Sequence, residues 1–477
     1  MRMRARRRAA LGVALAIALA GGARAQTDDG FHVTPGLGWS HGDHRVDLGV
    51  KFRARVESWD AFSDDADVFY GLKTRVKLAY SFRDQLVATV EGQQVQLLDM
   101  DATASGAERT YRNANEMHTE AGQLQLRQAN LAWRPIPQVQ LRAGRQDVTL
   151  GNEITYDEPD WSYLKTQRLG ERLLGTVGFS HVERATDAMT GWFENDWLRV
   201  DAFGGRPTTG VFAVDRGMRP LHDVVFGGGQ ATLKRDAWLP STELSLFGIG
   251  YDDDRPVEDG GMPHGVRVAT IGASWLGLYD VGPGRADALV WVAGQWGRFA
   301  GDDHRAAAGI AELGYQLPEA FLSPWLRAGV NVASGDGDPS DGEHTTFFDV
   351  LPTNHLYSGF ADQVEFQNLI DSFVQLRLTP HPTLGLNLFV HWFVLPSRDD
   401  ARYAGTGAFD LKSFGYTAQA TGGQSDVGLE YDAVATWQMH KTTTLEVGFC
   451  WLDGGDVFRD MPSRNTAFAY ASIWFRY

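Results

Sequence analysis

Apolar and polar residues alternate with a period of two along most of this chain. In residues 45–57 one parity is apolar and is made up of Val46, Leu48, Val50, Phe52, Ala54 and Val56. Charged residues fill most of the other parity, and residues 70–83 repeat the arrangement. Successive side chains of a β-strand point to opposite faces, so this pattern predicts strands with one apolar face and one charged face.

The alternation recurs along the whole sequence. The further segments are residues 86–96, 123–134, 138–148, 185–193, 197–204, 223–234, 242–251, 265–277, 286–298, 306–316, 324–333, 368–379, 383–394, 426–438, 442–452 and 467–477. We therefore expect about eighteen strands of about ten residues, the length that a tilted strand needs to cross a membrane. The predicted fold class is all-β: a transmembrane antiparallel β-barrel.

The connections between these segments alternate between short and long. The clearest short ones are residues 84–85, 135–137, 194–196, 379–382 and 440–441. The long ones are residues 99–122, 149–184, 252–264, 334–365 and 397–424. Outer-membrane barrels have short periplasmic turns and long extracellular loops, so this alternation supports the same fold.

The two ends of the chain indicate export to the outer membrane of a bacterium. Residues 1–25 combine an Arg-rich start, an apolar run and a small-residue cleavage site, which predicts a secretory signal peptide. Its removal would leave residues 26–477 as a single barrel domain and move the formal net charge from -16 to -22. The chain ends on Tyr477, with Phe475 and Ile473 on the same parity, and this resembles the terminal signal that barrel-assembly machinery reads.

The composition of the chain argues against several other classes of protein. No stretch after residue 25 reaches 18 uncharged apolar residues, so no transmembrane helix is expected. A closed sheet pairs every backbone group in lipid while only alternate residues are apolar. The acidic balance argues against a nucleic-acid partner, and a single Cys, Cys450, permits no internal disulfide and is interpreted as a small packing residue.

A barrel of this size encloses a lumen whose selectivity depends on its inward charges. Strand parity directs these cations inward: Lys51, Arg53, Arg55, Lys73, Arg75, Lys77, Arg127, Arg142, Arg199, Arg267, Arg327 and Arg377. It also directs these acids inward: Asp47, Glu57, Glu91, Asp201, Asp371, Glu430, Asp432 and Glu446. Two interpretations follow: structural ion pairs that balance the lumen, or a cationic stripe that favours the entry of anions.

Several segments resemble the alginate-export family of outer-membrane barrels. They are residues 126–133 (LRQANLAW), 141–147 (LRAGRQD), 333–339 (ASGDGDP), 347–348 (FF) and 352–362 (PTNHLYSGFAD). The resemblance implies a monomeric channel with an arginine-rich constriction that passes a polyuronate or another anionic solute. Arg127, Arg142 and Arg145 match the motif best; Arg145 has the opposite parity to Arg142, so it lines the pore only if a bulge or the strand end redirects it.

Other interpretations stay open. A general porin for small anions such as carboxylates is the alternative within transport, and a plugged structural barrel or an outer-membrane hydrolase would be a different class. His355 and Asp362 could form an acid–base couple, although a loop-packing hydrogen bond is favoured, and no nucleophile motif accompanies them. Asp336, Asp338 and Asp341, together with Glu343, resemble an oxygen-rich Ca²⁺ loop, but Asp341 stands where that pattern needs Gly. No cofactor is expected.

Overall fold

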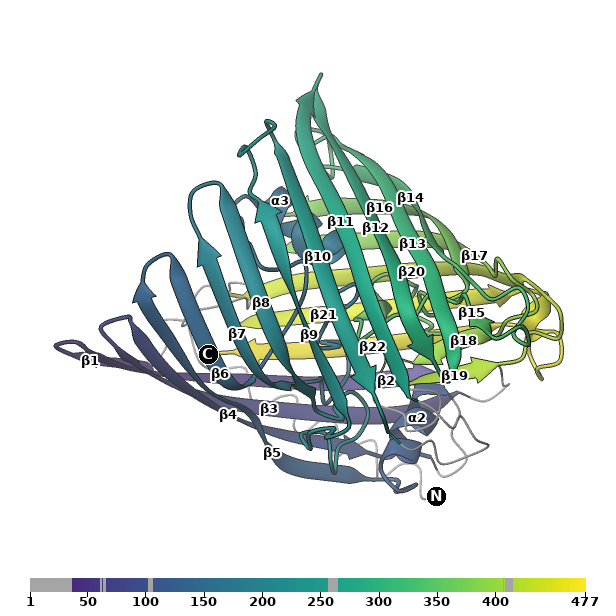
Figure 1. Ribbon diagram of the computed structural model, residues 1–477, viewed down its shortest axis with the longest axis horizontal. Coiled ribbons are helices and arrows are strands. Elements are labelled where there is room, and N and C mark those ends of the chain that lie inside the picture. The colour runs from purple at the N-terminus through teal and green to yellow at the C-terminus, as the bar shows by residue number, and fades with distance from the viewer. Residues whose placement is uncertain are drawn as a thin grey trace.

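The computed structural model describes residues 37–60, 62, 66–101, 106–255, 265–405, 407 and 415–477, and the predicted signal peptide lies outside these residues. Eighteen consecutive antiparallel strands form a closed barrel, as the alternation predicts (Figure 1). They are β2 (His44–Trp59), β3 (Asp67–Phe82), β4 (Leu86–Leu98), β5 (Ala121–Ile136), β6 (Val139–Gln146), β7 (Thr186–Glu194), β8 (Leu198–Pro207), β9 (Val224–Leu233), β10 (Thr242–Asp253), β11 (Val266–Val281), β12 (Gly284–Phe299), β13 (Asp302–Gln316), β14 (Trp325–Ala333), β16 (Leu369–His381), β17 (Leu384–Val394), β20 (Asp426–His440), β21 (Thr443–Gly454) and β22 (Thr466–Arg476).

The barrel closes between its first and last long strands. β2 pairs with β22 from Lys51 opposite Arg476 to Trp59 opposite Phe468. Val50 and Tyr477 then exchange two backbone hydrogen bonds of 2.8 Å. Beyond this point the short strand β1 (Leu37–His41) folds back on β2 and continues the edge that β22 leaves.

The alternation of the sequence becomes an apolar outer surface and a polar inner one. Leu124, Met189 and Leu313 are examples of outward side chains, with exposed fractions of 71%, 73% and 70%. Their inward neighbours are the polar and charged residues that fill the lumen. An apolar outer band of this kind is what a barrel presents to lipid. No helix among the described residues combines the length and apolar character needed to cross a bilayer.

The connections lie as expected at the two ends of the barrel. One end has short turns such as residues 137–138 and 441–442, and the other carries residues 147–185, 334–368 and 395–425. Several of the long connections contain short elements that the alternation does not reveal. They are α2 (Gly106–Ala114), α3 (Pro159–Leu164), η1 (Lys165–Leu169), β15 (Glu343–His344), η2 (Asn354–Leu356), β18 (Arg402–Gly405), β19 (Tyr416–Gln419) and η3 (Asp456–Phe458).

Candidate functional site

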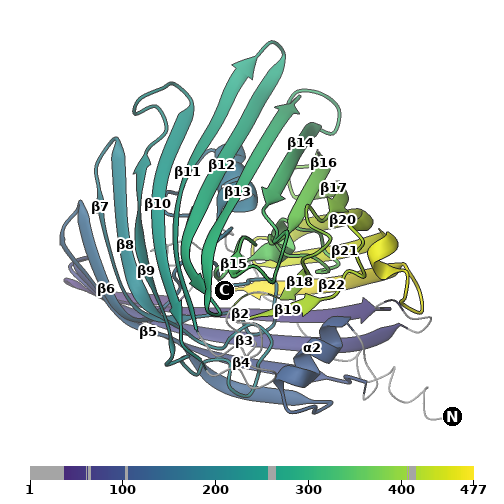
Figure 2. The same ribbon diagram turned by 45° about the vertical axis from the view of Figure 1, so that its right-hand side comes forward.

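The connection between β6 and β7, residues 147–185, is called the inner loop here because it folds into the barrel. It reaches strands on different walls: Arg168 donates to both carboxylate oxygens of Glu312 on β13 at 2.8 and 2.9 Å. On β17, Asn387 accepts a 3.3 Å hydrogen bond from the Tyr163 hydroxyl. On β2, Arg53 donates to the Ser180 carbonyl at 2.9 Å. The inner loop therefore crosses the lumen, and its helix α3, labelled in Figure 1, is the blue helix behind β12 in Figure 2.

Apolar side chains hold the inner loop inside. Trp161, Leu164, Leu173 and Leu174 are almost fully buried and belong to one cluster with barrel-wall residues. The Leu351 N–H, in the connection between β14 and β16, donates to the Leu173 carbonyl at 3.0 Å. Burying such side chains is worth roughly 1.5–3 kcal/mol each, which favours an inserted loop over a solvated one.

Glu183 of the inner loop gathers three of the predicted lumen cations. Its carboxylate lies 2.6 Å from the Lys73 ammonium, 2.7 Å from the Arg75 guanidinium and 3.2 Å from the Arg127 guanidinium. Burial alone would raise the pKa of Glu183, but these cations lower it well below its usual range. Arg127 also pairs with Asp147 at 2.5 Å. These three cations are committed to holding the loop.

A second network ties the loop to the opposite wall. Glu312 on β13 accepts from Arg168, Arg172 and Arg327, at 2.8, 2.8 and 3.0 Å. Arg327 also pairs with Asp287 at 2.8 Å. Burial opposes the charge of Arg168, but Glu312 outweighs it and raises the pKa of Arg168.

Three other predicted cations also bind protein groups. Arg55 donates to the Phe179 carbonyl at 2.7 Å and covers the Phe179 ring at 3.9 Å. Arg377 lies 4.2 Å above the Tyr163 ring. Arg199 pairs with Glu194 and Asp201, at 2.7 and 2.8 Å.

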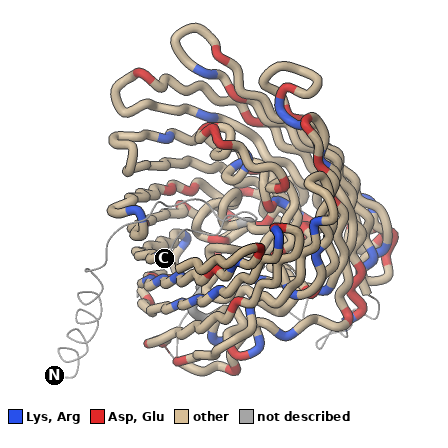
Figure 3. Tube along the Cα trace, turned by 90° about the vertical axis from the view of Figure 1, so that its left-hand side faces the viewer, with Lys and Arg blue, Asp and Glu red and all other residues tan. Residues whose placement is uncertain are grey.

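Below the inner loop, at the end with the short turns, lies a cavity of about 1360 Å³, called the vestibule here. Eleven Lys and Arg residues and eight Asp and Glu residues line it, which leaves an excess of positive charge. Lys77, Arg142 and Arg476 line it and form no ion pair with a described residue. Lys51 is directly opposite Arg75 on one neighbouring strand and Arg476 on the other, so cations lie side by side across β3, β2 and β22. Basic positions are seen on the strands beside the C-terminus (Figure 3).

The parity prediction is wrong for Arg267, which lies on the outer face. Val266 and Val268 are buried on either side of it, whereas the Arg267 side chain is 67% exposed and pairs with Asp252 and Asp254. The β11 strand turns its apolar parity inward at this end, where loop residues pack against it.

Arg145 also stays outside the lumen. A bulge does occur, but in β5: the β4–β5 register shifts after Glu91, so Arg127 and Gln128 both face inward. β6 pairs with β7 in unbroken register. Arg145 therefore keeps the outward parity, where it binds Asp187 through two hydrogen bonds of 2.7 and 2.8 Å.

The three Asp residues of the predicted calcium loop cap backbone groups of their own segment. Asp336 accepts from the Asp338 N–H at 3.1 Å, and Asp341 accepts from the Glu343 N–H at 2.8 Å. Asp338 accepts from the Ser340 hydroxyl at 2.6 Å. Their carboxylates do not converge within metal-binding distance of one another.

His355 and Asp362 do form the expected hydrogen bond, at 2.8 Å from Nδ1. The His355 ring stacks on Phe179 of the inner loop at 3.5 Å and packs edge-on against Phe360. This geometry is that of a packed loop contact.

Strand parity does not identify the residues that organise the lumen, above all Glu183, Arg168 and Trp161. A signal was present in residues 149–184, where Trp161, Leu164, Leu169, Leu173 and Leu174 make the segment too apolar for a solvated loop.

Comparisons with known proteins agree with this architecture. Residues 265–472 match the sequence profile of the family described as alginate export, which includes the 333–362 motifs but not those at 126–147. No curated protein matches the chain.

Solved outer-membrane proteins share the fold at low identity. Acinetobacter baumannii OccAB2 aligns with a TM-score of 0.59 and 9% identity, over 90% of this chain and 98% of that chain. Pseudomonas aeruginosa OpdK, crystallised with vanillate, aligns with a TM-score of 0.55 and 10% identity, over the same shares. Pseudomonas aeruginosa OccK5 (OpdH) aligns with a TM-score of 0.54 and 8% identity, over 90% and 97%. The chain is a porin-like β-barrel of the bacterial outer membrane, and its residues 265–472 are similar to the alginate export family.

Proposed function

We propose that this barrel is a channel for anionic solutes and that its preferred solute is alginate or a related uronate-containing saccharide. The observation that carries the proposal is the vestibule, where Lys77, Arg142 and Arg476 have no carboxylate partner among the described residues. Uncompensated cations on a concave, low-dielectric wall raise the local concentration of anions and lower their barrier to entry.

The cations of the lumen differ in whether they bind other groups of the protein, and this difference supports an anion channel. Arg53, Arg55, Arg127 and Arg327 are buried and bind groups of the protein itself. Of the cations that line the vestibule, Lys77, Arg142 and Arg476 are left available to a solute. A uronate chain carries a carboxylate on each sugar, so it could contact successive cations across neighbouring strands. The similarity of residues 265–472 to the alginate export family favours this solute class.

The proposal is tested by measuring ion selectivity and block of the channel current. The mature barrel is reconstituted in planar bilayers under a salt gradient, and oligouronates are compared with neutral oligosaccharides of equal length. We expect anion selectivity, block by the oligouronates alone, and loss of block in Lys77→Glu and Arg142→Glu. The matched control is Arg267→Glu, which changes the charge at an outward-facing position and should leave block intact. Equal block by charged and neutral sugars would contradict the proposal.

Small carboxylates are the second candidate. The inner loop crosses the lumen and narrows the path, and OpdK, which shares the fold, was crystallised with the carboxylate vanillate. If monomeric carboxylates permeate and compete with chloride while oligouronates neither block nor permeate, this second solute class is the right one.

A further inference from the structure

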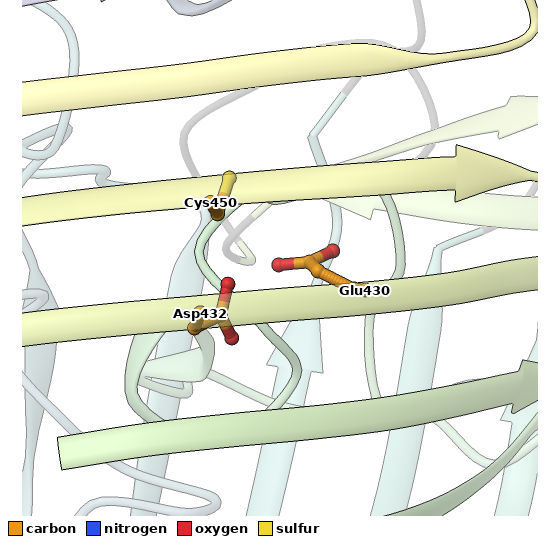
Figure 4. A group of neighbouring side chains, drawn as sticks. All are labelled: Glu430, Asp432 and Cys450. Atoms are coloured by element: carbon orange, nitrogen blue, oxygen red, sulfur yellow. The ribbon is translucent and has the colours of Figure 1, made fainter.

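Glu430, Asp432 and Cys450 form a compact group on the inner face of the barrel, called the thiol–carboxylate cluster here (Figure 4). Glu430 and Asp432 are two residues apart on β20 and share one face. Asp432 is directly opposite Cys450 in the β20–β21 register. One donor atom from each side chain lies within 4.8 Å of the others. Metal–ligand bonds of about 2.0–2.3 Å place the donors of a tetrahedral site roughly 3–4 Å apart, so small side-chain rotations would close this group around an ion.

The cluster is buried without compensating charge. The exposed fractions of Glu430, Asp432 and Cys450 are 0%, 3% and 0%. Both Asp432 oxygens and Glu430 Oε2 accept no well-aligned hydrogen bond from a described residue, and the polar groups nearest to Asp432 are the Phe360 N–H and the Glu430 carboxyl. No Lys or Arg among the described residues pairs with either carboxylate. Burying a charged carboxylate without a partner costs free energy. These oxygens are therefore expected to bind a cation or a proton.

His391 on β17 is the nearest candidate for a fourth donor, and its ring nitrogens lie outside the group of atoms that are all within 4.8 Å of one another. It is opposite Glu430 in the β17–β20 register, and its Nε2 lies 3.7 Å from an Asp432 oxygen. Its Nδ1 lies 2.9 Å from Asp371, which in turn accepts from Asn331 at 2.8 Å. Histidines that bind metals commonly donate their other ring N–H to a carboxylate, which fixes the ring and its tautomer.

We propose that Asp432, Glu430, Cys450 and His391 bind a structural divalent cation of the zinc class, with Asp371 orienting the histidine. The mixture of thiolate, imidazole and carboxylate donors suits Zn²⁺, whereas Ca²⁺ and Mg²⁺ prefer oxygen ligands alone. The dication would offset the two carboxylates and hold the thiol as thiolate, and the protons released would leave to solvent as the ion binds.

The position of the cluster assigns the ion a mechanical role. Glu430 Oε1 accepts a 2.9 Å hydrogen bond from the Ala361 N–H in the connection between β14 and β16. At Gly359, which has a positive φ of 81°, a Cβ would lie 2.4 Å from that carboxylate, so the backbone passes directly over the cluster. The ion would fasten this connection to the wall. The ion would also have to enter before this connection covers the cluster, so we expect it to bind while the barrel folds.

The test uses the full mature chain folded into detergent micelles with Zn²⁺ or Co²⁺ present, then freed of loose metal by chelator and dialysis. We expect one equivalent of retained metal and, for Co²⁺, a thiolate charge-transfer absorption. Cys450→Ser, which is close to isosteric, should lose that absorption. Asp371→Asn should weaken binding about 10- to 100-fold. Glu446→Gln, on the inner face of β21 but outside the cluster, should retain the metal.

A wild-type barrel that folds with either metal yet retains none would overturn the proposal, and the carboxylates would then share protons. Retained Co²⁺ without a thiolate absorption would overturn the assignment of Cys450 as a ligand. Because these readouts come from the wild-type chain, they decide the question even if a variant fails to fold.

Discussion

Glu183 takes part in three ion pairs, with Lys73 and Arg75 on β3 and with Arg127 on β5, and these pairs secure the end of the inner loop. Glu183→Gln would leave Lys73, Arg75 and Arg127 close together without their shared anion. Breaking a buried pair costs about 3–5 kcal/mol. We expect the inner loop to become sensitive to proteolysis from the extracellular side, measured as the rate of cleavage in micelles. Asp43→Asn, which removes the exposed pair with Arg83, should change nothing measurable.

His181 of the inner loop predicts a dependence on pH. Burial lowers its pKa from 6.5 to about 3, against the opposing effect of Glu57 at 2.7 Å. The docked loop therefore favours neutral His181, while a detached loop protonates it near pH 6.5. Docking loses stability as the pH falls from about 6.5 towards 3, by up to about 1.4 kcal/mol per pH unit.

Acidification across that window should raise the frequency of open-channel transitions in single-channel recordings. His181→Gln removes the titrating group and should flatten this part of the pH profile. An unchanged profile in the variant would show that His181 does not govern docking.

At this scale, strand parity predicts where a side chain points but not what it binds. It correctly places Lys73, Arg75 and Arg127 inside the barrel. It cannot foresee Glu183, because this partner lies 56 residues from Arg127 in a segment without alternation. The predicted inward orientation of Arg267 is wrong for a related reason. At this end of β11, loop residues pack against the apolar side chains and turn them inward.

At the scale of elements, the inner loop is the feature that sets the width of the channel. Replacing residues 156–172 by a short Gly/Ser linker removes α3, η1 and the Arg168–Glu312 contact. We expect single-channel conductance to rise at least several-fold because the cross-section of the lumen widens. Shortening residues 318–323, a turn at the opposite end that includes the 88% exposed Phe321, is the matched control and should leave conductance unchanged. Equal conductance in the two deletions would mean that the loop does not limit flow.

The strands themselves could be read almost completely from the sequence. All eighteen occur, with boundaries within four residues of the expected ones. Lipid on one side and a polar lumen on the other enforce the period of two on every strand. The connections escape prediction because neither environment imposes a period on them, so α3 and η1 are determined by tertiary packing.

At the scale of the whole molecule, the barrel separates its charges by role. One group of cations is neutralised by Glu183 and Glu312 and fixes the inner loop, and another group, Lys77, Arg142 and Arg476, lines the vestibule without a carboxylate partner among the described residues. A purely balanced lumen would use all its cations as the first group does. The vestibule departs from that pattern at Lys77, Arg142 and Arg476.

The sign of the ion selectivity tests this division most directly. The reversal potential is measured under a salt gradient for three reconstituted barrels. They are the wild type, the double variant Lys77→Glu/Arg142→Glu, and the outward-facing control Arg267→Glu. We expect anion selectivity in the wild type and the control, and a shift towards cations in the double variant. A wild-type barrel that prefers cations, or a double variant with the wild-type reversal potential, would contradict this expectation.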